Sequence, residues 1–362
     1  VFVMAEQREE IRKRMLEKLE HHVLDLRDFK TRQEVQRKLR QIRIEQEQGI
    51  SPDIKDESIK EYLERWYKNP NLRPSSIDSR RVNIKRVSPL IGGKELKSLR
   101  ASDIQFVYEE LAKTLSSSSV MQVHSMLRKA LGDAMKEGLI VSNPMKRVTQ
   151  TPKVVRREMT YLNQEEVVAL LKVEGQWKPL WALLVGTGLR LGEALGLQWK
   201  NIDEKSGTLK INRSLKKVTG LGLIYQNPKT EKSRRSIFMP TAVSKALSKH
   251  RVGQSEHRLK LGPDWINEDL VFPNEWGGPL EPGRINRALK KSLINAGIEK
   301  HFRVHDLRHT AASLALLKGI PGKVVQEMLG HSHYSTTMDI YSHVDPGMHI
   351  EASEKMNEVL EG

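Results

Sequence analysis

Apolar side chains recur every three or four residues over much of the chain, which is the period of an amphipathic helix. Within residues 51–148 this repeat comes in four blocks, and it predicts helices at 59–66, 74–88, 101–113 and 117–137. The connections between the blocks are short, so neighbouring helices are expected to pack side by side. This part of the chain is therefore predicted to be a small helical bundle.

The first 50 residues are rich in Glu, Lys, Arg and Gln and stand apart from the bundle. Leu16, Leu19, Val23 and Leu26 follow a 3-4-3 spacing that predicts a helix. The stripe is compatible with a short coiled-coil seam, and equally with a solvated amphipathic helix that has no partner. We expect a helical N-terminal segment at 1–50.

After residue 148 the pattern changes twice. Residues 149–158 are basic and carry no apolar repeat, which indicates a linker. In residues 159–345 alternating apolar residues predict strands at 208–212, 223–226 and 235–239. Helical patterns surround these strands at 164 onward, 177–185, 241–251, 282–296, in three short helices within 301–345, and in a tail at 346–362. The fold class is thus mainly α with a small antiparallel β-sheet, an N-terminal helical bundle being followed by an α+β domain.

The chain has 362 residues, enough for two or three domains with cores of their own. Its formal net charge of +16 and a pI near 9.8 indicate a polyanionic partner. We expect nucleic acid rather than a membrane, because no run approaches about 18 apolar residues and no signal peptide pattern opens the sequence. The absence of cysteine excludes disulfides, thiolate metal sites and cysteine nucleophiles, and it fits a reducing cytoplasm.

Several residues able to do chemistry gather near the C-terminus. His305 and Arg308 are three residues apart in H-D-L-R-H-T, so they share one face of a helix. His331 follows a glycine that closes a helix, and Tyr341 lies on the last short helix, for which Ser335 is the expected cap. Arginine matches phosphate oxygens, histidine moves protons near neutral pH, and a tyrosine hydroxyl can act as a nucleophile. This combination points to phosphoryl transfer through a phosphotyrosine.

A second arginine joins this set from earlier in the chain. Gly186 and Gly188 end a predicted helix, and Arg190 begins the next one. A guanidinium at a helix start lies beside backbone N–H groups, where an anion binds well. Glu193, one turn later, is expected to hold Arg190 in place.

In this order the motifs resemble those of the tyrosine recombinases, the phage integrase family. The pattern consists of G-T-G-x-R at 186–190, a lysine on a β-hairpin, H-x-x-R at 305–308, a histidine after L-G, and a tyrosine ten residues on. The resemblance implies a catalytic domain of tyrosine-recombinase type at 159–345. Its catalytic residues would be Arg190, Lys229, His305, Arg308, His331 and the nucleophile Tyr341. Lys229 lies in P-K-T…S-x-R, in the turn between the last two strands, and rests on the resemblance alone; Lys232 is the alternative.

The resemblance also implies a reaction. Such a protein would be a site-specific DNA recombinase or integrase that cleaves and rejoins double-stranded DNA through a 3′-phosphotyrosine intermediate. It would act as a homotetramer on its recombination sites, without a cofactor or a metal. The segment before residue 51 favours an integrase of a phage or conjugative element, which integrates or excises a mobile element together with accessory DNA-bending or directionality factors. The expected location is the bacterial cytoplasm, at the nucleoid when the protein is bound to DNA.

The same resemblance gives each part of the chain a role. Residues 51–148 would be the core-DNA-binding bundle, 149–158 the linker, 346–362 a tail helix that docks on a neighbouring subunit, and 1–50 a remnant or part of an arm-DNA-binding region. Basic side chains expected to contact DNA are Arg80, Arg81, Lys85, Arg86, Lys153, Arg156, Arg157, Lys232 and Arg234. On the bundle these charges fit an ordinary solvated face equally well.

Two other interpretations fit parts of the sequence. His305 and His309 have the i, i+4 spacing of two zinc ligands, but Asp306 stands where a metalloprotease has Glu, and Arg308 would repel a cation. Residues 320–341 resemble a helix-turn-helix, so the alternative function is a catalytically inactive DNA-binding regulator of the same fold. An inactive relative would, however, be expected to have lost one of the six catalytic residues.

Overall fold

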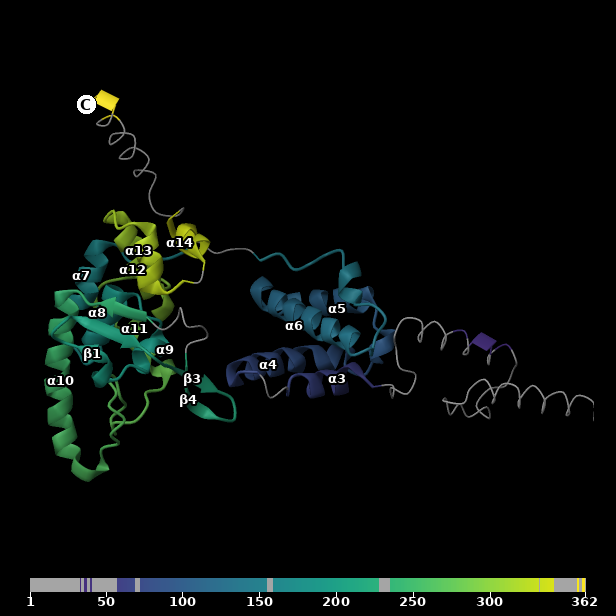
Figure 1. Ribbon diagram of the computed structural model, residues 1–362, viewed down its shortest axis with the longest axis horizontal. Helices are drawn as coiled ribbons and strands as arrows, with labels where there is room; N and C mark the ends of the chain where they lie inside the picture. The colour runs from purple at the N-terminus through teal and green to yellow at the C-terminus, as the bar shows by residue number, and fades with distance from the viewer. Residues whose placement is uncertain are drawn as a thin grey trace, which may run out of the picture. The chain divides into compact units, whose positions relative to one another are not determined.

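The computed structural model describes residues 57–68, 72–154, 159–227, 235–331 and 333–341, together with isolated helical positions at 33, 36, 37, 40, 357, 360 and 361. The chain divides into two compact units, Val1–Arg156 and Arg157–Gly362 (Figure 1). Apart from the isolated positions, the expected N-terminal and tail helices lie outside the described residues. The same is true of Arg156, Arg157, Lys229, Lys232 and Arg234.

Within residues 57–154, the described part of the first unit is a bundle of four helices, as the apolar repeat predicts. They are α3 (Ile59–Trp66), α4 (Pro74–Ile91), α5 (Ala101–Ala112) and α6 (Ser117–Lys136), and short 3-10 turns follow at Leu96–Ser98 and Pro144–Arg147. The Ser58 hydroxyl accepts from the Glu61 N–H while the Glu61 carboxylate accepts from the Ser58 N–H, so a capping box begins α3. In the core, the buried Tyr62 hydroxyl donates to the Ala130 carbonyl at 2.6 Å and ties α3 to α6.

One helix boundary in the bundle differs from the prediction. The pattern predicts that the second helix ends at residue 88, but α4 continues through Pro89 to Ile91. Proline removes one backbone hydrogen bond from a helix. Val87 and Ile91 are 0% and 2% exposed, and their burial in the core offsets that loss.

The second unit is built around α8 (Lys178–Thr187), which packs against helices on several sides. The other helices are α7 (Gln164–Lys172), α9 (Leu191–Leu195), α10 (Thr241–Leu261), α11 (Pro282–Asn295), α12 (Val304–Leu317), α13 (Gly322–Leu329) and α14 (Tyr334–Tyr341), with 3-10 turns at Trp199–Asn201 and Gly262–Asp264. Leu180, Trp181, Leu183 and Leu184 of α8 are all at most 1% exposed. The helix is apolar on several faces, which allows it to be buried between α7, α9, α10 and α12.

The strands form two small antiparallel sheets rather than one. The first sheet has the order β1-β2-β5, with β1 (Ile202–Asp203), β2 (Thr208–Ile211) and β5 (Arg235–Phe238), and the second pairs β3 (Ser214–Val218) with β4 (Gly222–Gln226). The prediction of a hairpin joining the strands on either side of 228–234 is therefore wrong, since β4 pairs with β3 and β5 pairs with β2. The prediction omitted β3 because Lys216 and Lys217 interrupt its apolar alternation.

Two further helix predictions need correction. The helix predicted at 241–251 runs ten residues longer, to Leu261, because Gly253 lies in open space on the helix surface and does not stop it. Ser335, the expected cap of the last short helix, is instead the second residue of α14. Within the part of the chain that the structure describes, no helix has both the length and the apolar character needed to cross a membrane.

Thr310 joins the start of the second unit to α12. The Leu162 N–H donates to Thr310 Oγ1 at 3.0 Å, and the Thr310 hydroxyl donates to the Asp306 carbonyl at 2.9 Å, all in the interior. We expect Thr310→Val to lower the free energy of unfolding by about 1–3 kcal/mol, since it leaves the Leu162 N–H buried without an acceptor. Urea unfolding followed by circular dichroism would measure this. Thr241→Val, the same change at an exposed position of α10, should have little effect.

Candidate active site

Arg190 lies where the sequence places it, at the junction of α8 and α9. Gly188 ends α8 in the left-handed conformation, at φ 63°, and Arg190 occupies the N-cap of α9. The Arg190 N–H donates to Glu193 Oε2 at 3.0 Å, and its Nη1 donates to Glu193 Oε1 at 2.8 Å. The Glu193 carboxylate therefore fixes both the backbone and the guanidinium of Arg190, as predicted from the one-turn spacing.

Arg308 is the most deeply buried arginine of the site, at 3% exposure on α12. Its Nη1 donates to the Gly188 carbonyl and its Nη2 to the Leu329 carbonyl, each at 2.7 Å. Burial and the neighbouring Arg190 lower the pKa of Arg308 to about 9, so the guanidinium still carries its charge at neutral pH. The charged guanidinium of Arg308 thus connects the C-terminal ends of α8 and α13.

A third arginine, Arg235, belongs to the same cluster and was not predicted. It is the first residue of β5, and its Nη2 donates to Glu193 Oε2 at 3.0 Å while its Nε donates to the Met328 carbonyl at 3.0 Å. The signal was present in the sequence, because the S-x-R pattern ends at Arg235. Arg234 and Arg235 have the same side chain, so the sequence alone did not show that Arg235 joins the cluster.

The two histidines of α12 lie side by side. The rings of His305 and His309 meet edge to face with centroids 5.0 Å apart. His305 is open to solvent at the helix surface, yet desolvation of part of its ring, His309 and Arg308 lower its pKa to about 4. His305 is therefore neutral at pH 7 and able to accept a proton.

His331 is held by contacts on both sides. Its backbone N–H donates to the Gln326 carbonyl at 3.1 Å, after Gly330 has closed α13 with a left-handed turn at φ 68°. Its Nδ1 lies 3.0 Å from the hydroxyl of the buried Thr337 on α14. Burial, Arg308 and Arg190 lower the pKa of His331 to about 3, so this imidazole is also neutral at pH 7.

Tyr341 is the last residue of α14, a helix that packs on α12 and α13. Its side chain lies outside the described part of the structure, so its reach to the cluster stays a prediction. Tyr334, the other tyrosine close behind His331, begins the same helix and packs its hydroxyl against Gly322, where an added Cβ would be 2.8 Å from the oxygen. Tyr334 therefore has a packing contact of its own.

The cluster carries more positive than negative charge. Three guanidinium groups, from Arg190, Arg235 and Arg308, share one carboxylate, that of Glu193. Burial alone would raise the pKa of Glu193, but Arg235 and Arg190 outweigh burial and hold it below its usual range. An anion with several oxygens would balance the excess charge, and a phosphate suits the planar donors of arginine.

Comparison with known proteins identifies the chain. Residues 160–348 match the model of the phage integrase family, and residues 58–112 match that of the phage integrase N-terminal SAM-like domain. A tyrosine recombinase XerC-like protein of Caldanaerobacter subterraneus subsp. tengcongensis is 30% identical over 337 residues, which cover 86% of each chain. The chain belongs to the phage integrase family. It is accordingly a tyrosine-type site-specific recombinase.

Solved structures of integrases share this fold. The Tn1549 transposon integrase in complex with transposon right end DNA matches 84% of this chain and 100% of its own, with a TM-score of 0.70 and 21% identity. A lambda integrase tetramer bound to a Holliday junction matches 79% of this chain and 78% of its own, with a TM-score of 0.58 and 18% identity. The predicted fold class, a helical bundle followed by a mainly helical catalytic unit with small antiparallel sheets, is confirmed.

A groove with a mainly apolar lining opens beside His305 and was also missed in the sequence. It has a volume of about 740 Å³, and its lining includes the cationic side chains of Lys290, Lys300 and Arg303. Lys300 is paired with Glu166 and Arg303 with Asp306, and these two cations and Lys290 on α11 are all exposed. The groove of the recombinase is therefore an apolar surface edged by cationic side chains.

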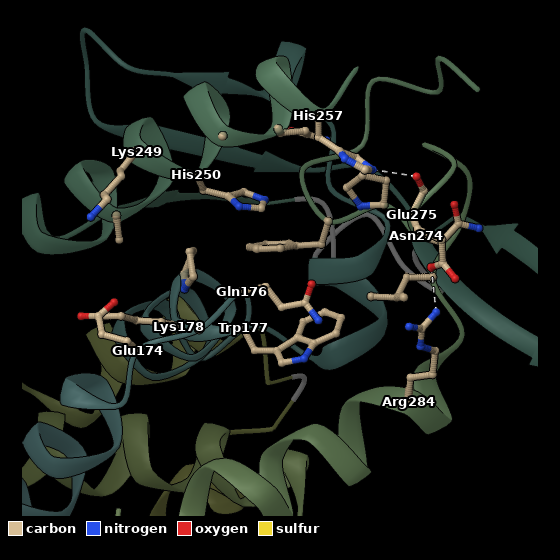
Figure 2. A pocket seen from close by; sticks show the side chains of 18 of the residues that line it. Glu174, Gln176, Trp177, Lys178, Lys249, His250, His257, Asn274, Glu275 and Arg284 are labelled. Atoms are coloured by element: carbon tan, nitrogen blue, oxygen red, sulfur yellow. Dashed lines mark hydrogen bonds and ion pairs between the residues drawn. The ribbon is translucent and has the colours of Figure 1, made fainter. Parts of the chain in front are cut away.

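A second cavity of similar size, about 760 Å³, lies elsewhere in this unit. Its lining includes Trp177 and Lys178 at the N-terminal end of α8, and Lys249, His250 and His257 from α10 (Figure 2). The arginine cluster gathers at the opposite, C-terminal end of α8, where Gly188 accepts from Arg308. This cavity is therefore separate from the arginine cluster.

The predicted DNA-binding residues of the bundle have mixed surroundings. Arg81 and Lys85 are exposed on α4, and Lys153 is exposed beyond the bundle. Arg86 donates to the Asn83 side chain at 3.0 Å, and the Arg80 guanidinium stacks 3.7 Å above the Trp66 ring. Arg80 therefore packs as well as presenting charge, and the DNA contacts of all these residues stay predictions.

Because His331 is neutral in the folded protein at pH 7, the free energy of unfolding is expected to depend on pH. Unfolded histidine titrates near pH 6.5, whereas folded His331 titrates near 3, so between these values the unfolded chain binds more protons. Stability of the recombinase should therefore fall as pH drops from 7 to 5. Urea unfolding at several pH values should show a shallower dependence for His331→Gln than for the unchanged protein. His301→Gln, at an exposed position, should leave the dependence as it is; equal slopes for both variants and the unchanged protein would contradict this account.

Proposed function

We propose that this recombinase cleaves and rejoins double-stranded DNA through a 3′-phosphotyrosine on Tyr341, and that it thereby integrates or excises a mobile element. The arginine cluster is the observation that supports this most strongly. Three guanidinium groups with one carboxylate leave a positive site at the meeting point of α9, α12, α13 and β5. A DNA phosphodiester carries the charge and the oxygens that this site lacks.

Arg190 and Arg308 would hold the two non-bridging oxygens of the scissile phosphate. As the tyrosine oxygen attacks, negative charge builds on these oxygens, and cations already in position stabilise it without rearranging. His331 would add a neutral donor. If the Thr337 hydroxyl donates to Nδ1, the ring proton resides on Nε2 and can be given to a phosphate oxygen.

The proposed reaction exchanges one phosphorus–oxygen bond for another. The Tyr341 oxygen bonds to phosphorus while the bond to the 5′-oxygen breaks, and Lys229 donates a proton to the leaving oxygen. His305 accepts the tyrosine proton, which its neutral ring can do at pH 7. A 5′-hydroxyl from the partner strand then reverses these steps and releases Tyr341. Because the phosphotyrosine conserves the bond, no ATP and no cofactor is needed.

The remaining parts would bring DNA to this centre. The bundle at 51–148 would bind the core site, the linker at 149–158 would follow the duplex, and the groove with Lys290 would receive the strand beyond the scissile phosphate. Tail helices at 346–362 would join four copies on two sites, in line with the lambda integrase tetramer on a Holliday junction. The likeness to a transposon integrase supports a mobile-element role. The proposal also includes accessory factors and a location in the bacterial cytoplasm.

The nucleophile can be tested with a nicked suicide substrate, which traps the covalent protein–DNA adduct. Tyr341→Phe removes only a hydroxyl, so DNA binding should persist while the adduct disappears. Denaturing gel electrophoresis separates the adduct from free DNA, and a mobility shift measures binding.

Tyr334→Phe is the matched control, because it makes the same change seven residues earlier on α14. It should still form the adduct, since its hydroxyl packs against Gly322. An adduct with Tyr341→Phe but not with Tyr334→Phe would move the nucleophile to Tyr334. DNA binding without any adduct by the unchanged protein would instead favour a catalytically inactive regulator.

Cleavage should also proceed in EDTA. Two permanent cations, Arg190 and Arg308, would supply the charge stabilisation that divalent ions give in other nucleases. Adduct yields measured with excess Mg²⁺ and with excess EDTA should agree within about twofold. A strict requirement for Mg²⁺ would contradict the proposed role of the arginines.

A further inference from the structure

The guanidinium of Arg235 makes three hydrogen-bond contacts within the arginine cluster. Its Nη2 donates to Glu193 Oε2 at 3.0 Å, its Nη1 reaches Glu193 Oε1 at 3.4 Å, and its Nε donates to the Met328 carbonyl at 3.0 Å. The first two contacts form the parallel pair that a guanidinium makes with a carboxylate. All three nitrogens of the guanidinium are thus turned toward the protein.

Burial separates the roles of the two arginines that share Glu193. The side chains of Arg235 and Glu193 are each 8% exposed, whereas that of Arg190 is 42% exposed. Arg235 and Glu193 therefore form the fixed, interior pair, and Arg190 is the member that faces outward. Of the two arginines that share Glu193, Arg190 is thus the one open to an incoming phosphate oxygen, and Arg235 is the one that contacts it only through the protein.

The same guanidinium also supports the turn that leads to His331. A Cβ on Gly330 would lie 2.9 Å from Arg235 Nη1, so glycine permits the guanidinium to pack directly against this turn. The Gly330 carbonyl in turn accepts from Arg190 Nη2 at 3.4 Å. Arg235 thus contacts both the carboxylate that holds Arg190 and the segment 328–330 from which His331 extends.

We infer that Arg235 is a positioning residue, which fixes Arg190 through Glu193 and His331 through the turn at 328–330. This inference rests on the proposed phosphotyrosine reaction. The two phosphate-binding groups that Arg235 positions are thus Arg190 and His331. In the sequence Arg235 also directly follows the segment 228–234, which contains Lys229. A misplacement of about 1 Å in such groups can cost roughly a hundredfold in rate.

Single-turnover adduct formation with saturating suicide substrate tests the inference. Arg235→Gln should slow the reaction by roughly 10- to 100-fold, with a change in DNA affinity of less than about threefold because the donors of Arg235 contact protein acceptors. Arg235→Lys retains the positive charge but not the planar pair of donors, so it should be nearly as slow as the Gln variant. Recovery of the full rate by lysine would show an effect of charge alone and would overturn the positioning role.

A substrate with an uncharged methylphosphonate at the scissile position separates positioning from general loss of structure. It removes the charge that Arg190 would stabilise, so the defect of Arg235→Gln should shrink to a few-fold on this substrate. Equal defects on phosphate and methylphosphonate would overturn the inference. Arg213→Gln is the matched control, because Arg213 also donates its Nε to a backbone carbonyl, that of Gly196 at 2.8 Å, and its contacts do not include Glu193. It should react at close to the normal rate on both substrates.

A double variant tests the route through Glu193. If Arg235 acts on Arg190 through this carboxylate, Glu193→Gln combined with Arg235→Gln should be little slower than the slower single variant. If the rate defects of the two single variants multiply in the double variant, Arg235 does not act through Glu193. If the unchanged protein forms no adduct, the proposed function fails and this inference with it; if it does and the Arg235 variants match it, only the inference fails.

Discussion

The buried carboxylate of Glu193 is the group on which the active site depends. It accepts from the backbone and side chain of Arg190 and from the side chain of Arg235, and so it balances charges that would otherwise repel one another in the interior. A buried ion pair contributes little stability by itself, but removal of one partner leaves an uncompensated charge at large cost. The lowered pKa of Glu193 means that it stays ionised over the range in which the enzyme would work.

Close backbone packing supplies the rest of the geometry. A Cβ on Gly188 would lie 2.3 Å from Leu329 Cδ2, so glycine allows the ends of α8 and α13 to meet. Both of the carbonyls that accept from Arg308 come from this meeting point, one from Gly188 and one from Leu329. The arginine replaces the hydrogen-bond partners that helix C-termini lack. The packing of α8 against α13 therefore also fixes the location of the Arg308 guanidinium.

Most helices and the order of the motifs could be predicted from the sequence, because apolar periodicity and glycine stops are local signals. Asn163 caps α7 and Gly330 closes α13, as their positions indicate. Strand pairing could not be predicted, since β4 and β5 take partners that depend on the whole fold. The role of Arg235 could not be predicted for the same reason, because its burial against Glu193 depends on the tertiary structure. The neighbouring Arg234 has the same side chain, so the sequence does not distinguish the two. The DNA contacts of the bundle depend on a partner that the sequence does not contain.

The excess charge of the arginine cluster has a consequence for the protein on its own. Arg190 and Arg235 both lower the pKa of Arg308, which means that the three cations repel one another in the folded protein. Folding has positioned these charges in advance, Glu193 offsets part of their repulsion, and an anion would offset more of it. In the proposed reaction a backbone phosphate of DNA would complete the electrostatic balance of the catalytic unit, so the substrate would serve as a structural component of the fold that cleaves it.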